Sequence, residues 1–192
     1  MKFGIIKQIV IMIVMFFALL ALYFGSYLPF VKAQKYIFFA GSMGNVKTLE
    51  QFKISVSDLF GFYSPVGQEE AVRFASQNIL NLMSAPNQPE AVVRDLAGII
   101  ETNSLKNNVR HLLNISSAYS ILWNRYKKPE DFLKMEDYIQ KTLAIGPDLP
   151  PALYPAFDLY RVEGNQAKLR EVGETILKNW PNDEMVRAVL GK

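Results

Sequence analysis

Cysteine is absent from this 192-residue sequence, and histidine occurs once. Without cysteine there is no disulfide scaffold, no thiolate metal site, no cysteine nucleophile and no lipid-modified cysteine anchor. The absence does not distinguish the cytosol from an oxidising compartment. The one histidine, His111, has no second histidine or cysteine with which to share a metal ion, so we expect no metal site.

Motifs that carry catalytic chemistry are also missing. Ser116 and Ser117 stand outside a Gly-x-Ser-x-Gly elbow. The paired acids Glu69-Glu70, Glu130-Asp131 and Asp183-Glu184 each fall near an expected helix start, where carboxylates offset the positive end of the helix dipole. We therefore predict a protein that is not an enzyme and has no catalytic residue and no cofactor.

The small surplus of positive charge is distributed unevenly along the sequence, with most of it at the N-terminus. The chain has 21 basic and 18 acidic residues, a net charge of +3. Residues 1–31 hold Lys2 and Lys7 and no acid, so 19 basic and 18 acidic residues remain beyond them, a net charge of +1. Nucleic-acid binding needs clustered surplus positive charge, so this balance argues against a nucleic-acid partner.

The longest uncharged run covers residues 8–31. As a helix it would be about 36 Å long, against about 30 Å for the hydrocarbon core of a bilayer. Aromatic residues gather at its far end like an interfacial belt: Tyr23, Phe24, Tyr27, Phe30 and Tyr36. Pro29 is expected to kink or end the helix. We predict a transmembrane anchor over residues 1–31 that contacts the lipid bilayer through residues 8–31, and a juxtamembrane connector over residues 32–46.

A cleavable signal peptide is the alternative, because Lys2 and Lys7 form a basic region ahead of the apolar run. The run is longer than the ~7–15 residues of a signal peptide, and no clean small-x-small cleavage site follows it, which favours a retained anchor. Lys32 and Lys35 flank the other side, so charge does not decide the orientation. A single anchor ahead of a large C-terminal domain usually leaves its short N-terminus in the cytoplasm, and we place the domain outside.

Helical periodicity continues beyond the anchor, without a period-2 strand pattern. Thr48 followed by Gln51 is a capping-box pattern at the first helix, which the turn at residues 64–67 ends. Val72, Ala75, Ile79 and Leu82 mark a second helix. Pro89 starts a third helix, and a fourth, longer helix follows. The inward residues expected are Val92, Leu96 and Ile99 on the third helix and Leu105, Val109, Leu112, Tyr119, Leu122 and Tyr126 on the fourth. We interpret residues 47–110 as degenerate helical pairs of an all-α fold.

The last third of the chain repeats itself at an offset of 34 residues. The matched pairs include Tyr126 and Tyr160, Leu143 and Leu177, and Pro147 and Pro181. Gly164-Asn165 supplies a turn between two helices, and Asn182 is the expected N-cap of a last helix. This pattern resembles the tetratricopeptide repeat, in which each helical pair stacks on a neighbour to bury its apolar face.

The resemblance implies two repeat units and a capping helix over residues 111–192. It implies an α-solenoid of antiparallel helix pairs behind a single N-terminal transmembrane helix. The sequence departs from the family where small packing residues are replaced by larger ones, and we expect wider helix spacing there. The larger residues are Trp123, Met135, Phe157 and Leu169.

In tetratricopeptide proteins the first helix of each unit lines an inner groove that binds a protein or peptide. Carried onto this chain, the partner-binding positions are Ser120, Asn124, Lys127, Tyr154, Asp158 and Arg161. The alternative is that these residues are solvated positions on a helix face. A carboxylate-clamp receptor is disfavoured, because the lysine of that clamp is missing where Ser120 stands.

A second resemblance concerns nearly the whole chain. A hydrophobic helix running into YLPFVKAQKYIFFA, then FYSPVGQEE, LAIGPDLPPALYPAFDLY and ILKNWPND, is similar to the C-terminal tail of bacterial O-antigen ligase or polymerase-like membrane proteins. The glycan chemistry of that family belongs to a multi-helix membrane portion that is absent here, so no catalytic residue is carried over.

Three hypotheses follow for a bacterial inner-membrane protein. The first is a tethered, non-catalytic protein-interaction module. The second is a detached or truncated accessory tail of a glycan-assembly protein. The third is a secreted repeat protein released by cleavage after the apolar run.

Overall fold

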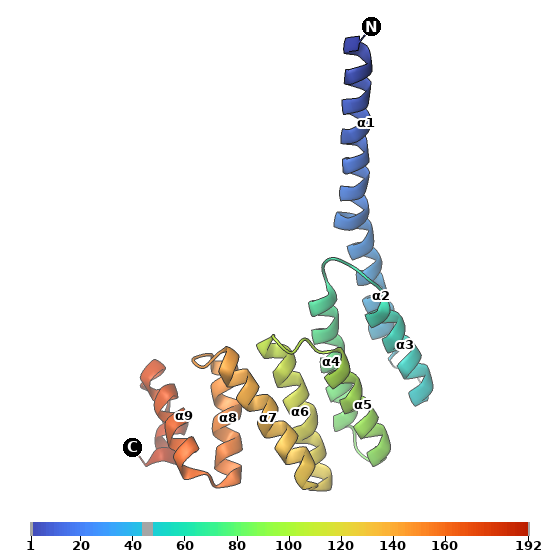
Figure 1. Ribbon diagram of the computed structural model, residues 1–192. Coiled ribbons are helices and arrows are strands. Elements are labelled where there is room, and N and C mark those ends of the chain that lie inside the picture. The colour runs from blue at the N-terminus through green and yellow to red at the C-terminus, as the bar shows by residue number, and fades with distance from the viewer. Residues whose placement is uncertain (1, 44–47, 192) are drawn as a thin grey trace. The chain divides into compact units, whose positions relative to one another are not determined.

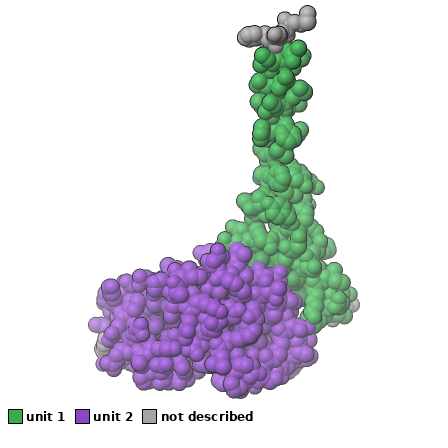
Figure 2. Space-filling view, viewed as in Figure 1, with its two compact units in different colours: residues 1–75 green, residues 76–192 purple. Residues whose placement is uncertain are grey.

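The computed structural model describes residues 2–43 and 48–191, and these residues form helices and connecting turns without a strand. The predicted all-α class is confirmed for them. Figure 1 shows the helices in chain order. Their bounds are α1 Lys2–Leu22, α2 Leu28–Ser42, α3 Leu49–Gly61, α4 Gln68–Ser84, α5 Glu90–Asn103, α6 Val109–Tyr126, α7 Pro129–Ile145, α8 Pro150–Glu163, α9 Gln166–Asn179 and α10 Glu184–Leu190. Two compact units, Met1–Ala75 and Ser76–Lys192, divide the chain within α4 (Figure 2).

From Ile9 to Leu22, helix α1 carries only apolar side chains, and the described part of the chain does not cover them. Phe17 and Leu19, for example, are 62% and 63% exposed. The core helix of a soluble protein would bury such side chains, since each buried Leu or Phe contributes about 1.5–3 kcal/mol. The helical stretch Ile5–Ser42 is long and apolar enough to cross a membrane.

The N-terminal helix does not end at Pro29. A π-helical segment, Tyr23–Tyr27 (η1), joins α1 to α2, and Pro29 stands in the first turn of α2. Proline lacks an N–H and its ring crowds the preceding turn, so a widened turn before it lets the helix continue. The expected connector over residues 32–46 is therefore helical as far as Ser42, and residues 44–46 lie outside the described residues.

The first unit has a small core between α2 and α3. Phe39 contacts Phe52 with ring centroids 5.9 Å apart, and Val56 and Leu59 are buried beside them. Thr48 caps α3 as predicted, because its hydroxyl accepts a hydrogen bond of 3.2 Å from the Gln51 N–H. These contacts place the start of α3 against the later part of α2.

In the second unit each helix from α5 to α9 packs on the next one, α10 packs on α9, and α6 also contacts α8. The predicted turn is confirmed: Gly164 has a φ of 78° at the end of α8, and the Asn165 side chain caps α9. The buried residues include Ile100, Leu112, Ile115, Leu122, Leu153, Phe157, Tyr160 and Ile176. Acidic pairs stand at the starts of α4, α7 and α10, as expected.

Several expected positions were wrong by one or a few residues. Val93 and Ile100 are fully buried on α5, whereas Val92 and Ile99 are only half-buried. Val92-Val93 and Ile99-Ile100 are pairs of adjacent apolar residues, and either member of each pair satisfies the helical spacing. The sequence pattern therefore did not decide which member faces the core. Leu105 is exposed and precedes α6, whose N-cap is Asn108. Asp183, not Asn182, caps α10, because the residue directly before the helix reaches its first N–H groups.

The spacing between equivalent positions of the pairs α6–α7 and α8–α9 is not the same for the first helices as for the second helices. Helices α7 and α9 end at Ile145 and Asn179, 34 residues apart. The left-handed residues that end α6 and α8, Lys127 and Gly164, are 37 residues apart. The reason is that α7 has 17 residues and α9 has 14. The offset of 34 therefore does not align the first helices of the two pairs.

Candidate binding groove

A cavity of about 400 Å³ lies among α6, α7 and α8 in the second unit. The residues from α6 are spaced three and four apart, which places them on one face of that helix. They are Leu113, Ser116, Ser117, Ser120, Trp123 and Asn124. Buried Met135 and Ile139 of α7 also line it, and α8 contributes Pro155, Asp158, Leu159 and Val162. The cavity thus combines apolar residues with neutral hydroxyl and amide groups and one acid.

Two further hollows adjoin this cavity. One, of about 350 Å³, is apolar and shares Trp123 and Val162 with it, and its other lining residues are Pro129, Phe132, Leu133 and Glu163. The Trp123 and Phe132 rings meet edge to face, with centroids 5.3 Å apart. Val162 is 67% exposed between the two hollows.

The other hollow, of about 340 Å³, is polar and shares Ser117 and Ser120 with the cavity. Its remaining lining residues are Gln77, Leu80, Asn81, Ser84, Asn114 and Ile121. Among the residues that the structure describes, no charged side chain lines this hollow. Its amides and hydroxyls can donate and accept hydrogen bonds. We call the three hollows together the groove. It has an apolar end at Leu133 and a neutral polar end at Gln77.

The structure brings three of the six predicted partner-binding residues into the cavity: Ser120, Asn124 and Asp158. Arg161 lies beside the cavity, where its guanidinium pairs with Asp158 at 2.9 Å. Lys127 is the left-handed residue that ends α6, and its Nζ lies 5.2 Å from the centroid of the Trp123 ring. These five residues are therefore neighbours of one hollow.

Tyr154 is separate from the other five. Its hydroxyl donates a 2.5 Å hydrogen bond to Asp183, and its ring lies 6.3 Å from that of Trp180. That hydrogen bond lowers the pKa of Asp183 and raises the pKa of Tyr154. Tyr154 thus connects α8 to the cap of α10 and does not line the groove.

Several groove residues were not predicted as binding residues. Trp123 lines two of the hollows. In the sequence it was noted only as a large residue at a position where the tetratricopeptide repeat has a small one. Ser117, Val162 and Leu133 gave no separate signal, because exposed residues on a helix face look alike in a sequence until the neighbouring helices are placed.

His111 is buried, and its Nδ1 accepts a 3.0 Å hydrogen bond from the Leu105 N–H. This contact holds the loop before α6 against the helix. Among the described residues, no three His, Cys, Asp or Glu side chains gather as metal ligands.

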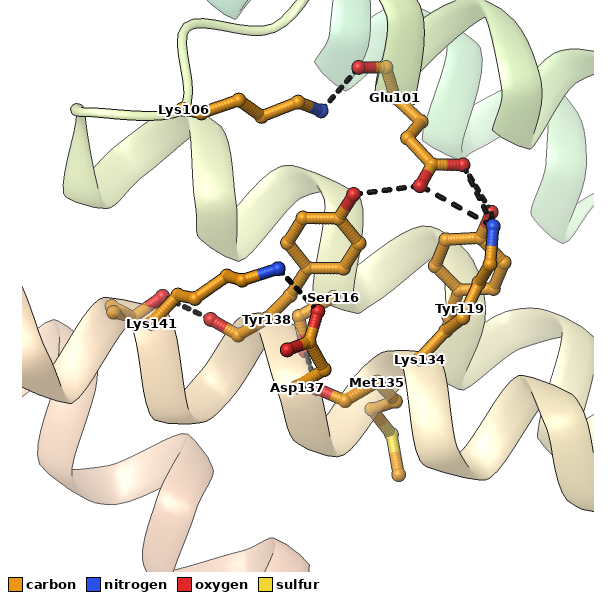
Figure 3. A network of polar contacts seen from close by, with 10 residues as sticks. Glu101, Lys106, Ser116, Tyr119, Lys134, Met135, Asp137, Tyr138 and Lys141 are labelled. Atoms are coloured by element: carbon orange, nitrogen blue, oxygen red, sulfur yellow. Dashed lines mark hydrogen bonds and ion pairs between the residues drawn. The ribbon is translucent and has the colours of Figure 1, made fainter.

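A polar cluster joins α5, α6 and α7 through Glu101. Its carboxylate accepts hydrogen bonds from the hydroxyls of Tyr119, at 2.5 Å, and Tyr138, at 2.6 Å. Lys134 adds an ion pair at 3.1 Å and donates a further bond to the Tyr119 hydroxyl at 2.8 Å. The two tyrosine rings are stacked, with centroids 6.2 Å apart (Figure 3). Each polar group thus has a partner within the cluster, which indicates a stabilising role.

Burial alone would raise the pKa of Glu101. The hydrogen bonds from Tyr119, Tyr138 and Lys134 outweigh it and hold the pKa of this carboxyl below its usual value. Burial, and then the bond to Glu101, raise the pKa of both tyrosines.

Replacing Glu101 with glutamine is expected to lower the free energy of unfolding at neutral pH by about 1–2 kcal/mol, because charge-assisted bonds are lost. Since the folded-state pKa is lowered, the contribution of Glu101 is complete above about pH 4.3 and is lost as the pH falls through the folded-state value. Wild type and variant should therefore converge at acidic pH. Chemical unfolding of the full chain in detergent micelles across pH checks this, with exposed Glu171→Gln as the control. A difference that stayed constant into acid would contradict the prediction.

Comparison with protein-family models, with curated proteins and with solved structures gives no match. The groove has both the size and the mixture of apolar and polar groups typical of binding sites.

Proposed function

We propose that this chain is a membrane-tethered, non-catalytic interaction module that binds a protein partner in the groove. The helix through residues 8–31 would hold it in a bacterial inner membrane, with the helical domain outside the cytoplasm. The helical domain would be a tetratricopeptide-type α-solenoid of antiparallel helix pairs.

The groove is the observation that carries this proposal. Its apolar end offers Trp123, Leu133 and Val162, of which Leu133 and Val162 are largely exposed. Exposed apolar surface next to polar groups is typical of interaction sites, and tryptophan is common among the residues that dominate binding energy. The neutral polar end suits the N–H and C=O groups of a polypeptide backbone.

The arrangement of the second unit supports the repeat interpretation. Helix pairs α6–α7 and α8–α9 follow one another with packing between consecutive helices, and short α10 packs on the last of them. Tyr160 and Gly164 stand at the core and turn positions that the repeat pattern requires. A stack of this kind leaves one face of its first helices open, and the groove lies on α6 and α8.

The alternative is that the chain is the accessory tail of a glycan-assembly protein similar to O-antigen ligases. The specific observation in its favour is that Trp123 lies beside neutral serine and asparagine side chains, because sugars stack on aromatic rings and pair with amides and hydroxyls. Further hydrophobic segments encoded upstream of Met1, in the same reading frame, would favour this alternative.

Replacing Val162 with arginine is expected to block the groove without unfolding the protein, because exposed substitutions change stability by about 0.5 kcal/mol or less. Partner capture should fall about tenfold or more if one central position is obstructed. Replacing Asn124 and Asp158 together with alanine should also reduce capture, by removing polar contacts.

The measurement is crosslinking and pull-down from membranes, quantified by mass spectrometry, with circular dichroism to check helicity. Met185→Arg is the matched control, because Met185 is an exposed apolar residue on α10 that does not line the groove. If Val162→Arg retrieves the same proteins as wild type and Met185→Arg, in the same amounts, the groove is not the binding site.

A further inference from the structure

The loop between α3 and α4, residues 62–67, is attached to the apolar N-terminal helix. Buried Lys32 of α2 donates hydrogen bonds from Nζ to the carbonyl oxygens of Leu59, at 2.6 Å, and Phe62, at 2.9 Å. Lys35 pairs with Asp58 at 2.5 Å, and its Nζ lies 5.4 Å from the centroid of the Phe62 ring. Two lysines of α2 therefore hold the end of α3 and the start of this loop.

These contacts fix the position of the loop along the N-terminal helix, and therefore its level relative to the bilayer. Lys32 is the first charged residue after the uncharged run 8–31. That run is about 36 Å long as a helix, against a hydrocarbon core of about 30 Å, so Lys32 falls at the level of the lipid headgroups. Figure 1 shows the connection between α3 and α4 at the end of these helices nearer to α1. The loop lies at the same level as Lys32.

The loop presents apolar side chains and no charge. Tyr63 is 68% exposed and Val66 is 58% exposed. No charged residue occurs from Leu59 to Gln68. The Ser64 hydroxyl donates a 2.6 Å hydrogen bond to the carbonyl oxygen of Val66, and Gly67 has a φ of 84°, so the turn has a defined shape. These apolar side chains are directed outward from an ordered turn.

Apolar surface continues beside the loop. A hollow of about 200 Å³ between α2 and the start of α4 is lined by the apolar residues Pro29, Ala33, Tyr36, Ala71 and Phe74, together with Lys32, Gly67 and Glu70. Phe30 of α2 and Phe74 of α4 are also exposed. Apolar side chains of α2 and α4 are therefore exposed in the first unit next to the loop, in addition to those of α1.

We propose that the loop 62–67 is a second membrane contact, in which Tyr63 and Val66 insert into the headgroup region of the leaflet through which the N-terminal helix emerges. The occupant of this surface is the lipid bilayer, because tyrosine is enriched at the membrane interface and an uncharged loop at this height is not repelled from it. Together with the helix, the loop gives the first unit two points of attachment, which restricts its tilt and rotation. This inference rests on the proposed membrane anchoring.

The absence of cysteine makes site-specific labelling a direct test. Single-cysteine variants of the full chain, Val66→Cys, Ile54→Cys and Val14→Cys, carry a nitroxide in vesicles of phosphatidylethanolamine and phosphatidylglycerol. Collision with dissolved oxygen and with a water-soluble nickel chelate reports depth. Ile54 is the matched control: it is an exposed apolar residue on α3, about 7.5 Å further than Leu59 from the membrane. Val14 reports the helix itself.

We expect the ratio of oxygen to chelate collisions at residue 66 to shift from the value at residue 54 toward the value at residue 14. Tyr63→Cys should give the same shift. If residues 63 and 66 are as accessible to the chelate as residue 54 while residue 14 is protected, the second contact is overturned and the anchor stands. If residue 14 is itself open to the chelate, the anchor fails, and the second contact fails with it.

Discussion

Replacing Tyr160 with alanine is expected to lower the free energy of unfolding by about 3–5 kcal/mol, as for other large-to-small substitutions of buried aromatic residues. Tyr160 is only 3% exposed on α8. Lys168 of α9 lies over its ring, with Nζ 5.0 Å from the centroid, which places the ring between the two helices. The Tyr160 carbonyl also accepts the 3.0 Å bond from the Asn165 N–H that closes the turn. Removing the ring would leave a cavity next to that turn.

Thermal unfolding of the full chain in detergent micelles, followed by circular dichroism, checks this prediction. A loss of 3 kcal/mol corresponds to a fall in Tm of roughly 10 °C for a unit of this size. Val162→Ala is the control on the same helix, because Val162 is exposed and its truncation should change stability by about 0.5 kcal/mol or less. A melt of Tyr160→Ala that matched Val162→Ala would show that the ring does not hold α8 to α9.

Local signals in the sequence predicted local features of the fold. Thr48 and the Gly164-Asn165 turn were predicted correctly, because a cap or a left-handed turn depends on a few adjacent residues. Pro29 was expected to kink or end the helix, and the helical structure as far as Ser42, where a connector was expected, was not predicted. It depends on the π-helical turn before Pro29, which no residue type specifies by itself.

The groove was predicted less completely than the helices that form it. The repeat pattern predicted Ser120, Asn124 and Asp158 as groove residues, and all three line one cavity. The turns at Lys127 and Gly164, however, do not follow the 34-residue offset on which the pattern was based. A concave surface depends on how three helices approach one another, and that approach is set by side chains distant in sequence. Tyr154 illustrates the limit, because its partner Asp183 lies 29 residues further along the chain.

Contacts between distant residues also decide the role of Asp131. An acidic residue in the first turn of α7 was expected to act on the helix dipole, and Asp131 does stand there. Its side chain is 2% exposed, however, and accepts two bonds from Arg94 of α5, from Nη1 at 2.9 Å and from Nη2 at 2.8 Å. These bonds, followed by that to Glu90, raise the pKa of Arg94 despite its partial burial. The pair joins the starts of α5 and α7.

Replacing Asp131 with alanine is expected to lower the free energy of unfolding by about 3 kcal/mol, because loss of one partner leaves a charge of a buried pair without compensation. Breaking a buried ion pair by removing one partner costs about 3–5 kcal/mol. The lower end of that range applies here, because Arg94 is partly exposed and keeps its 2.7 Å ion pair with Glu90. Asp137→Ala is the matched control on α7. Asp137 and Lys141 form an ion pair in which both side chains are more than half exposed, so its loss should cost about 0.5 kcal/mol or less.

A double variant separates the cost of an unpaired charge from the value of the pair. Arg94→Met with Asp131→Leu removes both charges and fills the space with apolar groups, and such replacements are often neutral or stabilising. The double variant should therefore be more stable than Asp131→Ala alone, by about 2 kcal/mol or more in chemical unfolding of the full chain in micelles. If Asp131→Ala were as mild as Asp137→Ala, solvent would already be screening the pair, and the link between α5 and α7 would lie in apolar packing instead.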